Sequence, residues 1–266
     1  MLGGYTANLT QVGEKIGSLI VGKRVPPDQP FHSNPMPVST LNILSSTLEV
    51  ALGPDYSYIF PTNFHVGNNA DGLVNQFGGV VSVEGDLRIG TGISDPAVGT
   101  YHMRGGSITA FEIRMGRYDQ PGVFIVAGDT NDISGIDAQI LMQYPTSTLS
   151  FILGETGTPG LSVAESVTLD GQLMLDLDEL GASLDSIVLI SNAGTSPLTT
   201  SFANAAEETL YSSNQGIYAL TYRFDAQGDA LYNDVAIMHV PLPSALWVLM
   251  PGLVALTLRP TIHRAP

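Results

Sequence analysis

The sequence predicts an all-β fold, a right-handed parallel β-helix in which short strands wind into a solenoid. The first observation is a repeat, because residues 72–90 (GLVNQFGGVVSVEGDLRIG) and residues 99–116 (GTYHMRGGSITAFEIRMG) share their landmarks. Each copy opens on glycine, contains a Gly-Gly pair and closes on an apolar residue followed by glycine. The second observation is that apolar side chains alternate within each copy, which is the period of a strand. An antiparallel β-sandwich, also built of short strands, is the alternative.

Further copies extend the repeat toward the N-terminus and the middle of the chain. Residues 8–23 echo the later copies, and residues 122–131 form a degraded one. The closures of an apolar residue and glycine fall at residues 21–22, 66–67, 89–90 and 115–116. Because the first spacing is about twice the others, we expect a missing closure near residues 43–50. The proline-rich residues 25–38 cannot pair as a central strand and are predicted to loop out.

The C-terminal half continues the strand pattern. Leucines alternate with aspartates in residues 166–180, and residues 186–191 (SIVLIS) are predicted to form a buried strand. Residues 216–240 predict a closing hairpin with its turn at residues 225–229. Three segments are expected: residues 1–145 as β-helical repeats, residues 146–239 as continuing β-helix and C-terminal β cap, and residues 240–266 as a tail. Since the chain begins in mid-repeat, we expect the true N-terminus to lie upstream.

Composition narrows the function classes. The 266 residues carry 10 Lys and Arg against 25 Asp and Glu, a net charge of −15. This balance argues against nucleic-acid binding, which needs clustered cations. The hydrophobic content of 44% is too high for a disordered chain. There is no cysteine, so a disulfide framework and a thiolate metal site are both excluded, and no cofactor is expected.

The acidic residues near position 170 are the strongest candidates for a catalytic site. On adjacent turns of a β-helix, Asp170, Asp176, Asp178 and Glu179 would resemble the acidic groove of a polysaccharide lyase or hydrolase. The competing interpretation is a solvated strand face opposite the leucines. We favour the solvated face, because such lyases also need a basic residue and none lies between Arg117 and Arg223.

Other candidate groups favour structural roles. Two aspartate clusters could bind calcium, but neither has a calcium-loop spacing and both fit turn chemistry: Asp129, Asp132 and Asp137, and Asp225, Asp229 and Asp234. The histidines are scattered, at His32, His65, His102, His239 and His263. Three tyrosines could stack on sugars, although core positions are the commoner role: Tyr58, Tyr101 and Tyr118. No catalytic, cofactor-binding or metal-binding residue is predicted.

The tail has an order of its own. Residues 244–258 carry no charge, contain Trp247 and are interrupted by Pro251. A bilayer-spanning helix needs about 20 apolar residues, so this segment is predicted as a short hydrophobic helix, either a marginal anchor or interfacial, with a buried strand as the alternative. The order of motif, apolar stretch and basic end resembles the PEP-CTERM sorting signal in its VPLP variant. The residues that carry this likeness are Val240, Pro241, Leu242 and Pro243 for recognition, and Arg259 and Arg264 for the basic end.

That resemblance implies a cellular location and a processing partner. A protein with this signal is secreted to the inner membrane of a Gram-negative bacterium, where an exosortase recognises the signal. The repeats themselves resemble the β-helical passengers of autotransporter-type surface proteins, through residues 78–90, 99–109 and 218–237.

We therefore expect an exported, non-enzymatic structural or adhesive protein of the cell surface or extracellular matrix. Its expected partners are an exosortase-type enzyme, the inner membrane transiently, and exopolysaccharide. The alternatives are a polysaccharide lyase or hydrolase on the same scaffold, and a cytoplasmic protein with a buried C-terminal strand.

Overall fold

The chain folds into strands without helices wherever the structure describes it. The computed structural model describes residues 6–10, 14–16, 18–23, 38–51, 62–92, 97–128, 133–155, 160–181, 184–195 and 198–241. All strands of this part belong to one hydrogen-bonded sheet. They are β1 (Thr6–Leu9), β2 (Glu14–Ile16), β3 (Leu19–Lys23), β4 (Ser39–Ile43), β5 (Thr47–Val50), β6 (Phe64–Asn68), β7 (Gly72–Ile89), β8 (Gly99–Met115), β9 (Gly122–Gly128), β10 (Ile133–Gln143), β11 (Thr148–Leu153), β12 (Leu161–Thr168), β13 (Gln172–Asp176), β14 (Ser186–Asn192), β15 (Leu210–Ser213), β16 (Gly216–Phe224) and β17 (Asp234–Val240).

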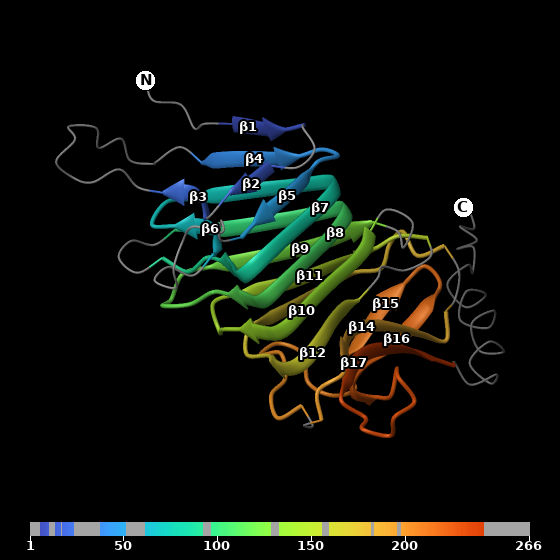
Figure 1. Cartoon of the computed structure of the whole chain (residues 1–266). Helices are drawn as coiled ribbons and strands as arrows, with labels where there is room; N and C mark the ends of the chain where they lie inside the picture. The colour runs from blue at the N-terminus through green and yellow to red at the C-terminus, as the bar shows by residue number, and fades with distance from the viewer. Residues whose placement is uncertain are drawn as a thin grey trace, which may run out of the picture.

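Strand β7 shows how the chain winds, because it pairs in parallel with three earlier strands in succession. Its residues 72–76 pair with β4, residues 80–83 with β5 and residues 87–89 with β6. Strand β8 then follows β7 along its length, so one turn lies directly on the next. A strand with three such partners turns two corners, and the result is a parallel β-helix (Figure 1). The β-helix prediction is confirmed against the β-sandwich, and the right-handed winding stays a prediction.

The helix has three faces, each a parallel sheet. The first face contains β1, β4, the start of β7, the start of β8, β9, β11 and β13. The second face contains β2, β5, the middle of β7 and β8, the start of β10 and β12, and the end of β14. The third face contains β3, β6 and the ends of β7, β8, β10 and β12.

One expectation about the repeat spacing is wrong. Strand β3 pairs directly with β6, and Val21 lies opposite Val66. The closures at these two residues therefore belong to consecutive turns, and no closure is missing between them. Residues 43–50 instead end the first face and form the second face of the same turn. The spacing is wide because this turn contains extra residues, including the predicted loop 25–38; of that loop, residues 25–37 lie outside the described residues.

The second glycine of each Gly-Gly pair makes a corner. Gly79 and Gly106 have φ of 74° and 83°, a conformation that other residues resist. The two corners also stack, because a Cβ on Gly106 would collide with the backbone of Gly79 one turn away. Glycine is therefore required here both for conformation and for the close approach of successive turns.

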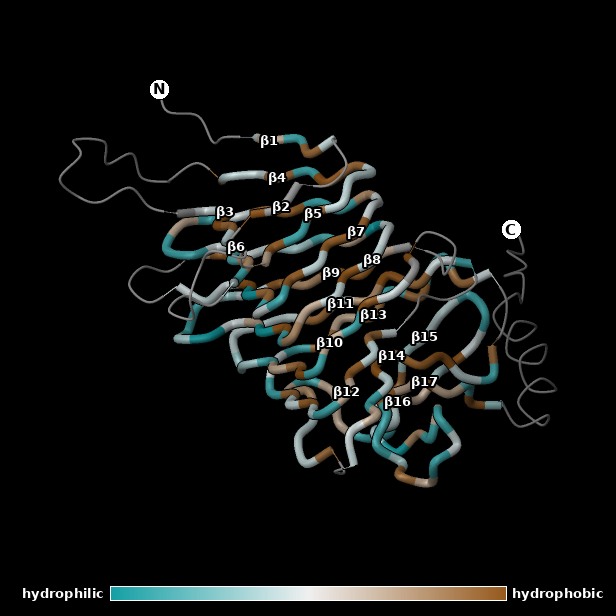
Figure 2. The backbone as a smooth tube through the Cα atoms, in the orientation of Figure 1, coloured by the Kyte–Doolittle hydropathy of each residue, from teal (hydrophilic) through white to brown (hydrophobic). Residues whose placement is uncertain are grey.

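Columns of apolar side chains fill the interior of the helix. One column on the first face runs in register through Val74, Tyr101, Phe124 and Leu149, and all four are buried. Figure 2 shows apolar and polar residues alternating along the stacked strands. This alternation follows from the strand period, which turns every second side chain inward.

An antiparallel cap closes the C-terminal end of the helix. Strand β17 pairs with β14 and β16, and β15 completes the cap (Figure 1). Residues 198–206 cross the edge of the last turn, where the Ala203 N–H donates to the Gly171 carbonyl at 2.7 Å. Phe202 in this segment is buried in the core. The predicted hairpin and C-terminal β cap are confirmed, and the predicted hydrophobic helix lies outside the described residues.

Candidate functional site

The acidic residues 170–179 are solvent-exposed. Asp170, Asp176, Asp178 and Glu179 are all exposed, on the loop before β13, at its end and in the turn that follows. The Asp178 N–H donates to Asp176 Oδ1 at 3.1 Å, so one of these carboxylates stabilises the turn. This arrangement agrees with the solvated strand face that the sequence favours.

The described aspartates of the two predicted clusters are at exposed or turn-forming positions, apart from Asp234. Asp129 and Asp132 lie outside the described residues, and Asp137 is exposed on the second face. Asp225 accepts hydrogen bonds from the Asp229 and Ala230 N–H groups, both at 3.0 Å, and therefore belongs to a turn. Within the described part of the chain, no group of three or more His, Asp or Glu side chains could hold a metal ion.

Asp234 is buried, unlike the other described carboxylates of these clusters, and its contacts are structural. Its Oδ1 accepts the Asn192 N–H at 2.7 Å, and its Oδ2 accepts the Ala226 N–H at 2.6 Å. The first bond joins the cap to the end of β14, on the last turn of the helix. Asp234 thus fixes the cap to the helix.

The described histidines lie on three different strands. His32 and His263 are outside the described residues, while His65, His102 and His239 lie on β6, β8 and β17. Burial lowers the pKa of His65 to about 4, and the neighbouring Arg88 adds to this effect. Burial and Arg104 also lower the pKa of His102, and His239 packs edge-on to Tyr218 with ring centroids 5.4 Å apart. No two of these imidazoles form a catalytic pair.

Tyr101 is a core residue, so its role as a sugar platform is wrong. Its ring is fully buried between Phe64 and Phe124, with centroids 6.1 and 5.6 Å away. Its hydroxyl donates to Gln76 Oε1 at 2.7 Å, and burial raises the pKa of the phenol. Tyr118 is exposed beside Arg117, whose guanidinium lies 4.3 Å from the ring centroid. Tyr58 lies outside the described residues.

The last described strand ends where the predicted sorting motif begins. Val240 is the last residue of β17 and lies opposite Ile217, and Pro241 follows it at an exposed position. Leu242, Pro243, Arg259 and Arg264 lie outside the described residues. Among the residues that the structure describes, no helix has the length and apolarity to cross a bilayer.

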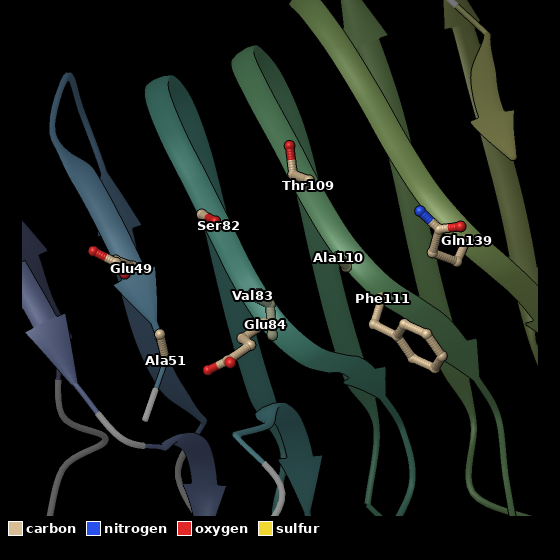
Figure 3. A pocket seen from close by; sticks show the side chains of 9 residues that line it. All are labelled: Glu49, Ala51, Ser82, Val83, Glu84, Thr109, Ala110, Phe111 and Gln139. Atoms are coloured by element: carbon tan, nitrogen blue, oxygen red, sulfur yellow. The ribbon is translucent and has the colours of Figure 1, made fainter. Parts of the chain in front are cut away.

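The second face carries a shallow depression that the sequence does not predict. It encloses about 490 Å³ on the outside of the helix and spans four adjacent strand segments (Figure 3). The lining residues are Glu49, Ala51, Ser82, Val83, Glu84, Thr109, Ala110, Phe111 and Gln139. We call this feature the second-face hollow.

The chemistry of the second-face hollow is that of a binding surface. Two carboxylates, two hydroxyls, an amide and an exposed phenyl ring line it, and none of the described lining residues is cationic. The residues come from β5, β7, β8 and β10 and from the position after β5, so they are separated by up to 90 positions between Glu49 and Gln139. Only the stacking of turns brings them together.

Comparisons of this chain with protein families, with curated proteins and with solved structures find no match. The fold and the surface chemistry are therefore the basis for any functional conclusion.

Proposed function

We propose that this chain is an exported, non-enzymatic structural or adhesive protein of the cell surface or extracellular matrix, sorted by an exosortase-type system. The observation that carries the proposal is the boundary at Val240. The last strand of the cap ends at this residue, which is also the first residue of the VPLP motif, and the apolar stretch follows the motif. A processing enzyme could therefore reach the motif and remove the tail without disturbing the described core.

The solenoid suits a surface role. Stacked turns give a long surface in which each turn is supported by its neighbours, and no catalytic pocket is needed for this. The net charge of −15 keeps such a surface soluble and repels anionic polymers. The basic end, with Arg259 and Arg264, would remain on the cytoplasmic side of the inner membrane and leave the β-helix outside.

The experiment is the intact mass of the protein expressed in an exosortase-bearing Gram-negative host. The wild-type protein is expected to lose everything beyond about residue 243, while a Pro241→Ala/Pro243→Ala variant keeps its tail and stays in the inner membrane. Pro260→Ala is the matched control, since this proline lies in the tail outside the motif, and it should be processed normally. A wild-type mass that includes the complete tail would overturn the sorting proposal.

The second candidate is a polysaccharide lyase or hydrolase, and one observation favours it. The second-face hollow contains two carboxylates, Glu49 and Glu84, which is the residue pair that glycoside hydrolysis needs. Reducing-end release from polysaccharides, measured for the wild type and for Glu49→Gln and Glu84→Gln, separates the two functions. Release that falls at least 100-fold in both variants would establish an enzyme, and unchanged polymers support the binding role.

A further inference from the structure

The second-face hollow exists because side chains of different length stand next to one another. Its floor is formed by Ser82 and Thr109, which are register partners on β7 and β8. Longer side chains border this floor on one side, where Glu84 on β7, Phe111 on β8 and Gln139 on β10 form the next outward row along the strands (Figure 3). The floor is part of a rigid parallel sheet, so the hollow is formed before any ligand arrives.

Phe111 gives the hollow an apolar surface. Its side chain is 47% exposed, although it belongs to a strand with a well-filled inner face. A single exposed aromatic residue is common on a soluble protein and needs no explanation alone. Here the ring borders a hollow lined with hydroxyl, amide and carboxylate groups, which offer hydrogen bonds beside a flat apolar face. Ligands that combine C–H faces with hydroxyl groups match this combination.

The polar groups form a regular row along the helix axis. Glu49, Ser82, Thr109 and Asp137 are successive register partners on four strand segments. Neighbouring strands lie about 4.8 Å apart, a spacing close to the length of one pyranose ring. Hydroxyls both donate and accept hydrogen bonds, and carboxylates accept them strongly. A linear polysaccharide along the axis would therefore present one sugar to each strand.

The charge of the hollow selects among polysaccharides. The described lining includes Glu49 and Glu84 and no lysine, arginine or histidine. Carboxylates repel a uronate or sulfate polymer, whereas they bind the hydroxyls of an uncharged one. We propose that the second-face hollow binds a neutral polysaccharide chain laid along the helix axis, with Phe111 stacked on a sugar ring. This inference rests on the proposed adhesive function for its biological setting.

Native gel electrophoresis of the full chain through gels containing a polysaccharide tests the proposal. Hydroxyethyl cellulose and galactomannan, which have extended β-1,4-linked backbones, are the neutral probes, and alginate is the anionic one. We expect at least one neutral polymer to retard the protein and alginate to have no effect. Phe111→Ala should weaken the apparent affinity about tenfold, and Thr109→Val should weaken it less. Phe77→Ala is the matched control, because Phe77 is 45% exposed but lies outside the hollow, and it should stay within about twofold of the wild type.

Several results would overturn the proposal. They are a lack of retardation by either neutral polymer, retardation by alginate of equal strength, or unchanged retardation of the Phe111→Ala variant. Sedimentation of the protein without polysaccharide gives a further test. If the wild type self-associates and Phe111→Ala abolishes the association, this face is a contact with a second copy and the proposal fails. Far-ultraviolet circular dichroism confirms that the variants fold. The gel result is independent of tail processing. Failure of the polysaccharide-binding proposal therefore leaves the sorting proposal unaffected, and failure of the sorting proposal leaves the polysaccharide-binding proposal unaffected.

Discussion

Glu112 and Arg114 form a two-point ion pair on the outside of the third face. Arg114 Nε donates to Oε1 at 2.7 Å and Nη2 to Oε2 at 2.5 Å. The same relationship occurs one turn earlier, where Arg88 donates to Asp86 Oδ2 at 3.0 and 2.6 Å. Register places Asp86 opposite Glu112 and Arg88 opposite Arg114, so the two pairs stack and each arginine has a carboxylate beside it. The hydrogen bond to Glu112 raises the pKa of Arg114.

Replacing Glu112 by glutamine should destabilise the helix. Glu112 is 5% exposed, and its loss leaves the Arg114 guanidinium with Asp86, 4.0 Å away and already bound to Arg88, as its neighbouring carboxylate. We expect the free energy of unfolding to fall by about 1–3 kcal/mol in urea titrations, because the two arginines then share one carboxylate in a partly buried site. Glu165→Gln is the control, since Glu165 is exposed on β12, and its effect should stay within about 0.5 kcal/mol. Equal effects of the two substitutions would contradict this role.

The stability of the wild-type protein should fall between pH 7 and pH 5 in part through His65. Burial lowers its pKa to about 4, and Arg88 acts in the same direction while Asp86 opposes it. The unfolded chain, with a pKa near 6.5, therefore binds more protons in this window, so acid favours unfolding. After allowance for partial exposure, the wild type should lose about 1–2 kcal/mol more than His65→Gln between these pH values. Urea unfolding at both pH values measures this difference, and parallel losses in the two proteins would exclude the effect.

The repeat was readable from the sequence because glycine and strand periodicity are local signals. The Gly-Gly pairs that end at Gly79 and Gly106 indicate a corner without reference to distant parts of the chain. The spacing of the closures mispredicts the position of residues 43–50, because insertions change this spacing without changing which strands pair. The stacked ion pairs did have a signal. An acidic residue stands two positions before arginine at the same place in both copies, as DLR at residues 86–88 and EIR at residues 112–114.

The second-face hollow could not be predicted in the same way. Its residues come from four turns of the helix, and Glu49 is brought next to Ser82 only by the register of β5 on β7. That register depends on loops of unequal length, which a single sequence does not align. The exposure of Phe111 cannot be predicted from the sequence either. An apolar residue at an outward position interrupts the alternation from which inward and outward faces are inferred.

Substitution of a corner glycine should be more damaging than its backbone angle alone implies. In Gly106→Ala the alanine must adopt a positive φ of 83°, and its Cβ also collides with the backbone of Gly79. Gly228→Ala is a matched control, because φ is 70° there and nothing lies within 4 Å of the Cβ position. We expect a loss of about 1 kcal/mol for Gly228→Ala and about 3 kcal/mol or more for Gly106→Ala, measured by urea unfolding. Similar losses would mean that the turns can separate at this corner.

The C-terminal cap should protect the last turn of the helix, and Phe202 is one of the buried apolar side chains at this end. Phe202 is 2% exposed, its ring lies 6.1 Å from that of Tyr222, and its N–H donates to the Tyr222 hydroxyl at 3.1 Å. Phe202→Ala should lower the free energy of unfolding by about 3–4 kcal/mol through the cavity it creates. A loosened cap also exposes the edge of β13, so light scattering should show association at concentrations where the wild type is monodisperse. Met174→Ala on β13 is the control, because its 57% exposed side chain fills no cavity and should change neither measurement. A Phe202→Ala protein that is destabilised but does not associate would show that residues 198–206 contribute packing without shielding the edge.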